Sequence, residues 1–302
     1  MRIARPYVPL RDRILDLSFI IMLLACAVII SLYAYNQQQE HLSIDQRIQA
    51  SRQSYHESVA RESTTWDSAA PTEPYNLIYP SRTGAFDIHK TAQEPRPVRQ
   101  RFLDLMEEYN NSDIVGYLQI ENTSIDYIVV QSEDNDYYLS RDIYKNNSSP
   151  GWIFVDFRNN MVTGDDPSVI IYGHNMKRDI MFHAIRYFKD YSFYKDHPTI
   201  IFDSLYEDGV WEIFSFFITS VDFYYIQTDF ADKHEFYQLA LEIKSRSMYE
   251  TGINVSSDDR ILLLSTCAGG APDTRCVLAA RLVNTTAPHR FRLSANQADQ
   301  IR

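Results

Sequence analysis

One long apolar stretch, LSFIIMLLACAVIISLYAY, fills residues 17–35 near the start of the chain. It contains no charged side chain and is close to the length of about 20 residues that crosses a bilayer. Four arginines precede it within residues 1–16, whereas no Lys or Arg follows until Arg47. The positive-inside bias therefore predicts a cytoplasmic segment at 1–16, a transmembrane helix at 17–35 and an extracellular remainder.

Two other interpretations of this stretch are open. A cleaved secretory signal needs small residues at its cleavage site, and SLYAYN has no clean A-x-A pattern. The tetrapeptide LLAC, ending at Cys26, resembles a lipoprotein box, but the residues after Cys26 stay largely apolar where a lipoprotein turns polar. We therefore favour an uncleaved anchor.

Residues 36–98 are mostly polar, and their second half is broken by Pro and Gly in AAPTEPYNLIYPSRTG. The earlier part, SIDQRIQASRQSYHESVARES, can form a surface helix. This composition predicts a stalk or linker that holds a folded domain away from the membrane.

From Gln100 the pattern changes to an amphipathic helix, RQRFLDLMEEYN, followed by short β-type segments. Eight such runs, several joined by short turns, predict a mostly β domain, either a sandwich or a small closed barrel. A late helix interrupts the strands, with Asp232 as its N-cap and Glu235 three residues on. We assign 99–288 to this domain and 289–302 to a tail. The eight runs cover 114–120, 125–131, 152–157, 168–174, 199–203, 210–226, 260–267 and 275–283.

Charge and motifs narrow the class of function. The net charge of −11 argues against nucleic-acid binding, which needs a basic face. The sequence has no C-x-x-C pair, no glycine-rich phosphate loop and no H-E-x-x-H, so we expect no metal and no cofactor.

Cys267 ends the apolar run RILLLSTC, directly before a loop that begins AGGAP. A strand end fixes a reactive group and the loop admits a substrate, although free Cys is more often a buried apolar residue. A disulfide with Cys276 is a further alternative, but Cys276 lies inside the next predicted strand, where its side chain need not point back.

Two more residues are candidates for chemistry at that point. His174 ends a second apolar strand, SVIIYGH, in the same way as Cys267, and strand ends can meet at one end of a barrel. Arg275 begins the strand after Cys267, and pairing of the two strands would bring its guanidinium near the thiol, where it could stabilise an oxyanion. Taken alone, each is better interpreted as an exposed surface residue.

Together the segments YGHNM, LLLSTC and TRCVLAARL resemble the sortase family, specifically class B. The resemblance extends from about residue 100 to 284 and includes NSDIVGYLQIENTSIDYIVVQSEDNDYYL, GWIFVDFRN and GHNMKRDIMFHAIRYF. It differs from the class B pattern at Leu263, where a Thr is frequent, and in having Asp273 as the only acid of the loop after Cys267.

The resemblance implies a closed β-barrel of about eight strands, with an N-terminal helix and an inserted late helix, in a membrane-anchored cysteine transpeptidase of bacteria, mostly Gram-positive. It makes Cys267 the nucleophile, His174 the general acid and base, and Arg275 the oxyanion or substrate-positioning residue. The family's substrate groove would include Asn135, Leu139, Tyr225, Ile226 and Ser265.

The implied reaction cleaves a Thr-containing sorting signal of a secreted protein and transfers it from a Cys thioester to an amine. The acceptor would be a cell-wall peptide, as in a peptidoglycan precursor, or another protein of pilin type. The enzyme would lie in the cell membrane with its catalytic domain outside. The alternatives are an anchored peptide-binding module without turnover and a different cell-wall cysteine peptidase.

Overall fold

The computed structural model describes residues 10–65, 97–267 and 273–283, and the predicted tail at 289–302 lies outside them. The chain divides into two compact units, Met1–Ser51 and Arg52–Arg302. The first contains most of helix α1 (Leu10–Thr65). Among the described residues α1 is the one helix long and apolar enough, by length and composition, to cross a membrane. The predicted anchor therefore coincides with a continuous helix.

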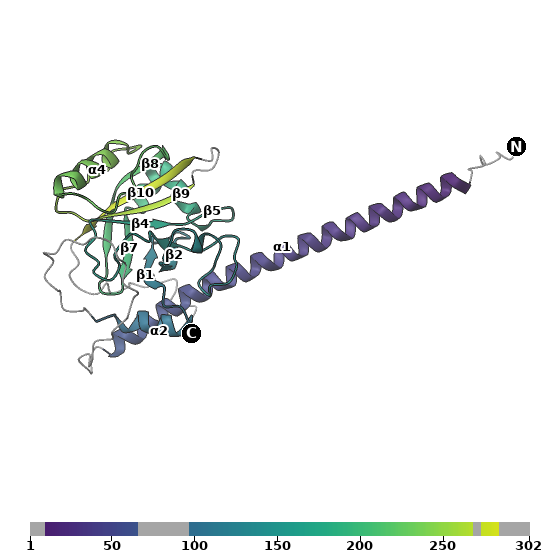
Figure 1. Cartoon of the computed structure of the whole chain (residues 1–302), viewed down its shortest axis with the longest axis horizontal. Helices are drawn as coiled ribbons and strands as arrows, with labels where there is room; N and C mark the ends of the chain where they lie inside the picture. Colours follow the sequence, from purple (N-terminus) through teal and green to yellow (C-terminus); the bar gives the residue numbers. More distant parts are fainter. Residues whose placement is uncertain (1–9, 66–96, 268–272, 284–302) are drawn as a thin grey trace. The chain divides into compact units, whose positions relative to one another are not determined.

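The second unit is a closed eight-stranded barrel in the order β1-β2-β3-β4-β9-β10-β8-β7, which confirms the predicted fold class (Figure 1). A two-stranded sheet, β5 and β6, is separate from it. The strands are β1 (Ile114–Gln119), β2 (Asp126–Val130), β3 (Phe154–Val155), β4 (Ser168–Tyr172), β5 (Asn175–Met176), β6 (Ile180–Met181), β7 (Thr199–Ser204), β8 (Val210–Ser220), β9 (Ile261–Cys267) and β10 (Thr274–Val283). The helices of this unit, besides the end of α1, are α2 (Gln100–Glu108), α3 (Tyr191–Asp196) and α4 (Lys233–Ser245), with 3₁₀ turns η1 (Tyr137–Leu139) and η2 (His183–Lys189).

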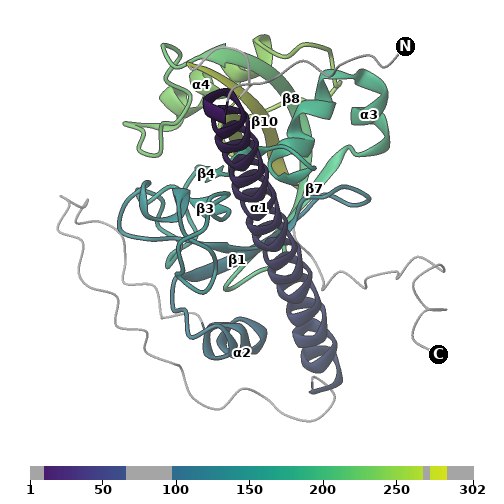
Figure 2. The ribbon, with the colours of Figure 1, turned by 90° about the vertical axis from the view of Figure 1, so that its right-hand side faces the viewer.

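The late helix α4 covers one face of the sheet, beside β8 and β10 (Figures 1 and 2). Its N-terminus is capped as predicted, because Asp232 Oδ1 accepts a hydrogen bond of 2.8 Å from the Glu235 backbone N–H. The apolar side of α4 packs on β8, β9 and β10, where it forms one cluster with Leu263 and Val277. Because the barrel interior covers the opposite face, β9 is apolar at successive positions rather than alternating.

One sequence prediction needs correction. The run 210–226 is not one strand: β8 ends at Ser220, which pairs with Thr274, the first residue of β10, and the chain turns at Val221 and Asp222. Within the range expected for the stalk, Arg52–Thr65 of α1 belongs to the same compact unit as the barrel. The rest of that stalk, from residue 66 to 96, lies outside the described residues.

Tyr55 shows how this part of α1 is held. Its side chain is fully buried, its ring stacks on Tyr117 of β1 at a centroid distance of 3.4 Å, and its hydroxyl donates a 2.6 Å hydrogen bond to Asp203 Oδ2 of β7. Nearby, Arg52 Nη2 donates a 2.7 Å hydrogen bond to the Ser124 carbonyl. Residues 52–65 are therefore part of the folded barrel unit and not of a tether.

Replacing Tyr55 with alanine should destabilise the barrel unit by about 3 kcal/mol or more, because it removes a buried aromatic ring and the 2.6 Å hydrogen bond that its hydroxyl donates to buried Asp203. For a unit of this size the melting temperature should fall by roughly 6 °C or more. Gln53→Ala, at an exposed position on the same helix, is the control and should leave the melting temperature unchanged. Equal melting temperatures for both variants would contradict a structural role for this segment.

Candidate active site

The strand register brings the three predicted catalytic residues to one end of the barrel. β9 lies between β4, which runs parallel to it, and β10, which runs antiparallel. Arg275 is directly opposite Cys267 in the β9–β10 ladder. Tyr172 is opposite Ser265 in the β4–β9 ladder, so His174 and Cys267 each lie two residues beyond a paired position.

These residues also share one face of the sheet. Side chains two residues apart in a strand point to the same side, so Cys267 follows Leu263 and Ser265 on the face covered by α4. Ser265 is buried there and shares a 2.7 Å hydrogen bond with the Tyr225 hydroxyl, whereas Cys267 is exposed. The thiol therefore lies where the covering layer ends.

Tyr225 lies close to Cys267 of β9 and to Arg275 of β10. Burial raises the pKa of Tyr225, while its hydrogen bond to Ser265 and the charge of Arg275 lower it in part. Its phenol therefore stays protonated at neutral pH. The predicted groove residues Tyr225 and Ser265 are thus in contact with each other and adjacent to the end of β9.

Two contacts hold the loop after β4. His174 Nε2 lies 2.9 Å from the Leu139 carbonyl of η1, which brings the predicted groove residue Leu139 to the histidine. Asn175 Nδ2 donates a 2.8 Å hydrogen bond to the Cys267 carbonyl, and His183 Nδ1 lies 2.8 Å from Asn175 Oδ1. The sequence indicated His174 but not Asn175, although both belong to the segment YGHN.

Asp156 connects the remaining segments predicted to form the groove, and no sequence motif indicated this role. Its side chain is fully buried, and its Oδ2 accepts hydrogen bonds from Asn135 Nδ2 at 3.1 Å and from the Tyr172 hydroxyl at 2.8 Å. Arg158 Nη2 lies 2.7 Å from the same oxygen and also donates to the Ile226 carbonyl at 2.9 Å. The pair Asp156–Arg158 therefore links the segments that carry Asn135, Ile226 and, through Tyr172, His174.

The charge state of Asp156 follows from these contacts. Burial alone would raise the pKa of its carboxyl, but hydrogen bonds from Arg158 and Tyr172 and the charge of Arg158 outweigh burial and lower the pKa below its ordinary value. Asp156 is therefore ionised at neutral pH, and its bonds to Arg158 are charge-assisted.

Gly173 explains the spacing between β4 and His174. A Cβ atom built on Gly173 would collide with Ile153 Cδ1 and lie 2.8 Å from the Phe182 ring. Only glycine lets the chain pass these two buried side chains and then present His174.

With His174 in its predicted role as general acid and base, Gly173→Ala should displace this side chain and reduce turnover by at least about 10-fold, since small displacements of a reacting group are costly. Steady-state kinetics on the full chain would measure this loss. The control is Gly252→Ala: Gly252 has a positive φ of 78°, but a Cβ there meets no atom within 4 Å, so any effect should be confined to stability. Unchanged turnover of Gly173→Ala would contradict the positioning argument.

The cysteines are not bonded to each other. Cys267 and Cys276 are both free, and they lie on opposite faces of the sheet because Cys276 is one residue from Arg275, the partner of Cys267. Burial raises the pKa of the Cys276 thiol. Of the two described cysteines in the barrel, Cys267 is thus the accessible one.

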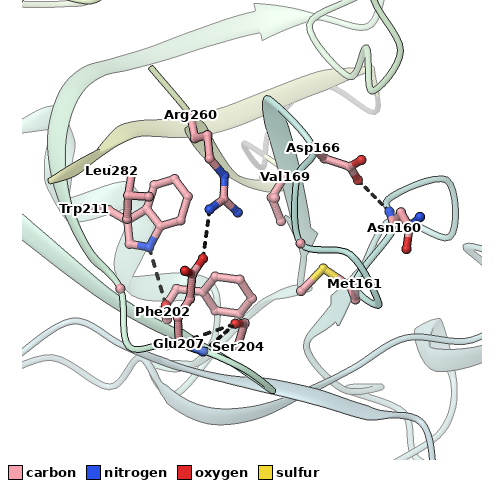
Figure 3. A pocket seen from close by; sticks show the side chains of 12 residues that line it. Asn160, Met161, Asp166, Val169, Phe202, Ser204, Glu207, Trp211, Arg260 and Leu282 are labelled. Atoms are coloured by element: carbon pink, nitrogen blue, oxygen red, sulfur yellow. Dashed lines mark hydrogen bonds and ion pairs between the residues drawn. The ribbon is translucent and has the colours of Figure 1, made fainter. Parts of the chain in front are cut away.

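A cavity at the other end of the barrel is distinct from this site. It lies beside Arg260, directly before β9, where an ion pair of 2.9 Å joins Arg260 to Glu207 (Figure 3). Its volume is about 10 Å³, which holds one water and no peptide. No cluster of three metal-ligating side chains occurs within the described ranges.

The fold and the site define a β-barrel with an exposed cysteine and a histidine at neighbouring strand ends. Residues 118–283 match the model of the sortase domain. The chain is 41% identical over 172 residues to Sortase B of Listeria monocytogenes, covering 56% of this chain and 68% of that protein. It is 34% identical over 191 residues to Sortase B of Staphylococcus aureus, covering 63% and 77%.

Solved structures agree. The Staphylococcus aureus sortase B–substrate complex superposes with a TM-score of 0.59 at 34% identity, covering 63% of this chain and 87% of that chain. Sortase B from Bacillus anthracis in complex with AAEK2 gives a TM-score of 0.58 at 34% identity, covering 66% and 90%. The chain belongs to the sortase family, in class B, and is by family a cysteine transpeptidase.

Proposed function

We propose that this protein cleaves a Thr-containing sorting signal near the end of a secreted protein and transfers the new acyl end to an amine outside the membrane. The observation that carries the proposal is the exposed Cys267 at the end of β9, with the end of β4 that carries His174 on one side and Arg275 in register on the other. The family supports the reaction class.

In the first half-reaction the Cys267 thiolate attacks the Thr carbonyl carbon, and a C–S bond forms. Arg275 donates hydrogen bonds to the carbonyl oxygen as negative charge develops on it. The C–N bond of the peptide then breaks, and His174 gives a proton to the leaving amine. The product is a thioester between Cys267 and the sorting signal.

In the second half-reaction an acceptor amine attacks the thioester carbonyl and passes its proton to His174. A new amide forms and Cys267 leaves as the thiolate. Because one amide replaces another through a thioester, no ATP is consumed. The cycle therefore suits an enzyme whose catalytic unit lies outside the membrane and whose α1 anchors it there with the N-terminus inside.

The sorting signal would lie along the face of the sheet where Ser265 and Tyr225 precede Cys267. Leu139 is 38% exposed beside His174, and Asn135 and Ile226 are held near the same end by Asp156 and Arg158. We assign Asn135, Leu139, Tyr225, Ile226 and Ser265 to the walls of this groove. An acyl donor bound there would present its Thr carbonyl to the thiol.

The full chain, a panel of fluorescence-quenched sorting peptides and a set of candidate amines test the proposal. Cleavage without amine and formation of a new amide with amine are expected. An amine of a cell-wall peptide and one of a protein would be compared as acceptors. Binding of a sorting peptide without cleavage would favour an anchored binding module, and cleavage of wall peptides alone would favour a different cell-wall peptidase.

A further inference from the structure

We infer that a basic cavity on the other side of the β9–β10 end binds a carboxylate of the acceptor, so that the preferred acceptor is a peptide with both a free amine and a free carboxylate. This rests on the proposed transpeptidase function. The cavity has a volume of about 430 Å³, within the range of ligand sites. Its lining residues are His183, Arg186, Tyr187, Lys189, Ile218, Thr274 and Cys276.

The side chains that line the cavity carry positive charge, whereas the whole chain has a net negative charge. The chain has a net charge of −11, yet this cavity is lined by Arg186, Lys189 and His183 and by no carboxylate. Within the described ranges, neither Arg186 nor Lys189 forms an ion pair with an acid. Three acids are close to the lining residues: Asp190 follows Lys189 and accepts hydrogen bonds from Ser192, Asp179 interacts with Tyr187, and Asp273 directly precedes Thr274. The two cations are therefore available to an anion from solution.

Arg186 and Lys189 both act electrostatically on Cys276, which lines the cavity. Burial raises the pKa of the Cys276 thiol, and the charges of Arg186 and Lys189 partly offset that effect. The Arg186 and Lys189 side chains therefore lie close enough to Cys276 to reach a ligand bound against it. An arginine fork binds a carboxylate through two hydrogen bonds, and a lysine adds a point charge. Tyr187 and Ile218, which are 42% and 44% exposed, offer apolar surface to the aliphatic part of a peptide.

The cavity is next to the nucleophile but on the opposite side of the sheet from the groove. Thr274 and Cys276 flank Arg275, the partner of Cys267, and point to the other face. His183 in the cavity wall contacts Asn175, which donates to the Cys267 carbonyl. A donor peptide on the Tyr225 face and an acceptor in the cavity could therefore both reach the end of β9 without competing for space.

The test uses the full chain with Arg186→Glu and Lys189→Glu combined. The acceptors are an amine-bearing dipeptide with a free C-terminal carboxylate and the same dipeptide as its C-terminal amide. Transfer to the carboxylate acceptor should fall at least about 10-fold through a higher KM, while transfer to the amide and cleavage of the sorting peptide stay unchanged. Lys195→Glu with Lys233→Glu makes the same change in net charge away from the cavity and should leave transfer to both acceptors unchanged.

Equal loss with both acceptors, or equal loss in the control variant, would overturn the inference. A second measurement separates it from the proposed function. Binding of the carboxylate dipeptide to the full chain with Cys267→Ala, followed by calorimetry, needs no turnover. Loss of this binding in the Arg186→Glu, Lys189→Glu background supports the cavity even where no sorting peptide is cleaved. Absence of binding, or binding that the two substitutions leave unchanged, overturns it.

Discussion

Replacing Cys267 with alanine should reduce cleavage of a sorting peptide to the uncatalysed background. In the proposed reaction the Cys267 sulfur forms the acyl-enzyme, and Cys276, the other described cysteine of the barrel unit, lies on the opposite face of the sheet. The loss should appear in kcat, since the peptide can still bind along Ser265 and Tyr225. Initial rates of the full chain with a fluorescence-quenched peptide would measure it.

Cys276→Ala is the matched control, because Cys276 is buried one residue from Arg275 on the other face. It should keep turnover within about twofold if the protein folds, which its melting temperature reports. If Cys276→Ala lost turnover and Cys267→Ala kept it, the nucleophile would be Cys276, and the assignment of Cys267 would be refuted.

Replacing Asp156 with alanine should lower kcat/KM by about 100-fold, a loss typical of misplaced substrate-positioning groups. The substitution removes the acceptor shared by Asn135 and Tyr172 and the charge that holds Arg158. It also leaves the buried part of Arg158 without its counter-ion, which is costly. Both groove walls and the strand that leads to His174 should shift.

A structural role alone would lower stability without changing kinetics at temperatures where the protein is folded. The kinetics of Asp156→Ala are therefore compared with those of Tyr55→Ala, which should lower the melting temperature while leaving kcat/KM unchanged below it. Asp156→Asn keeps an oxygen for Tyr172 and should recover part of the activity. Equal kcat/KM for wild type and Asp156→Ala would refute the positioning role.

The lowered pKa of Asp156 also predicts a pH dependence. Its folded pKa is below the unfolded value of about 3.9, so its contribution to stability is complete above that value and is lost as pH falls through the folded pKa. Asp156→Asn should remove this contribution to acid sensitivity. The unfolding free energies of wild type and Asp156→Asn, measured from pH 7 downward, should converge as the pH falls through the folded pKa of Asp156. A gap that widens toward low pH would contradict the sign.

The sequence predicted the parts of the site that local pattern determines. Cys267 and His174 each follow an apolar strand and precede a loop, and Asp232 with Glu235 forms a local capping pattern. The roles of Asp156 and Arg158 were not predictable, because their partners Asn135, Tyr172 and Ile226 come together only when the barrel closes. For the same reason the burial of Tyr55 depends on Tyr117, which the polar sequence around Tyr55 does not indicate.

The measurement that tests the account most directly is the intact mass of the full chain after brief reaction with a Thr-containing sorting peptide. A mass increase equal to the acyl part of the peptide, located on Cys267 after digestion and reversed by an amine, is the predicted result. Two results would contradict the central claim that this thiol forms the acyl-enzyme. One is cleavage of a peptide without any adduct on the protein, and the other is an adduct on a residue other than Cys267.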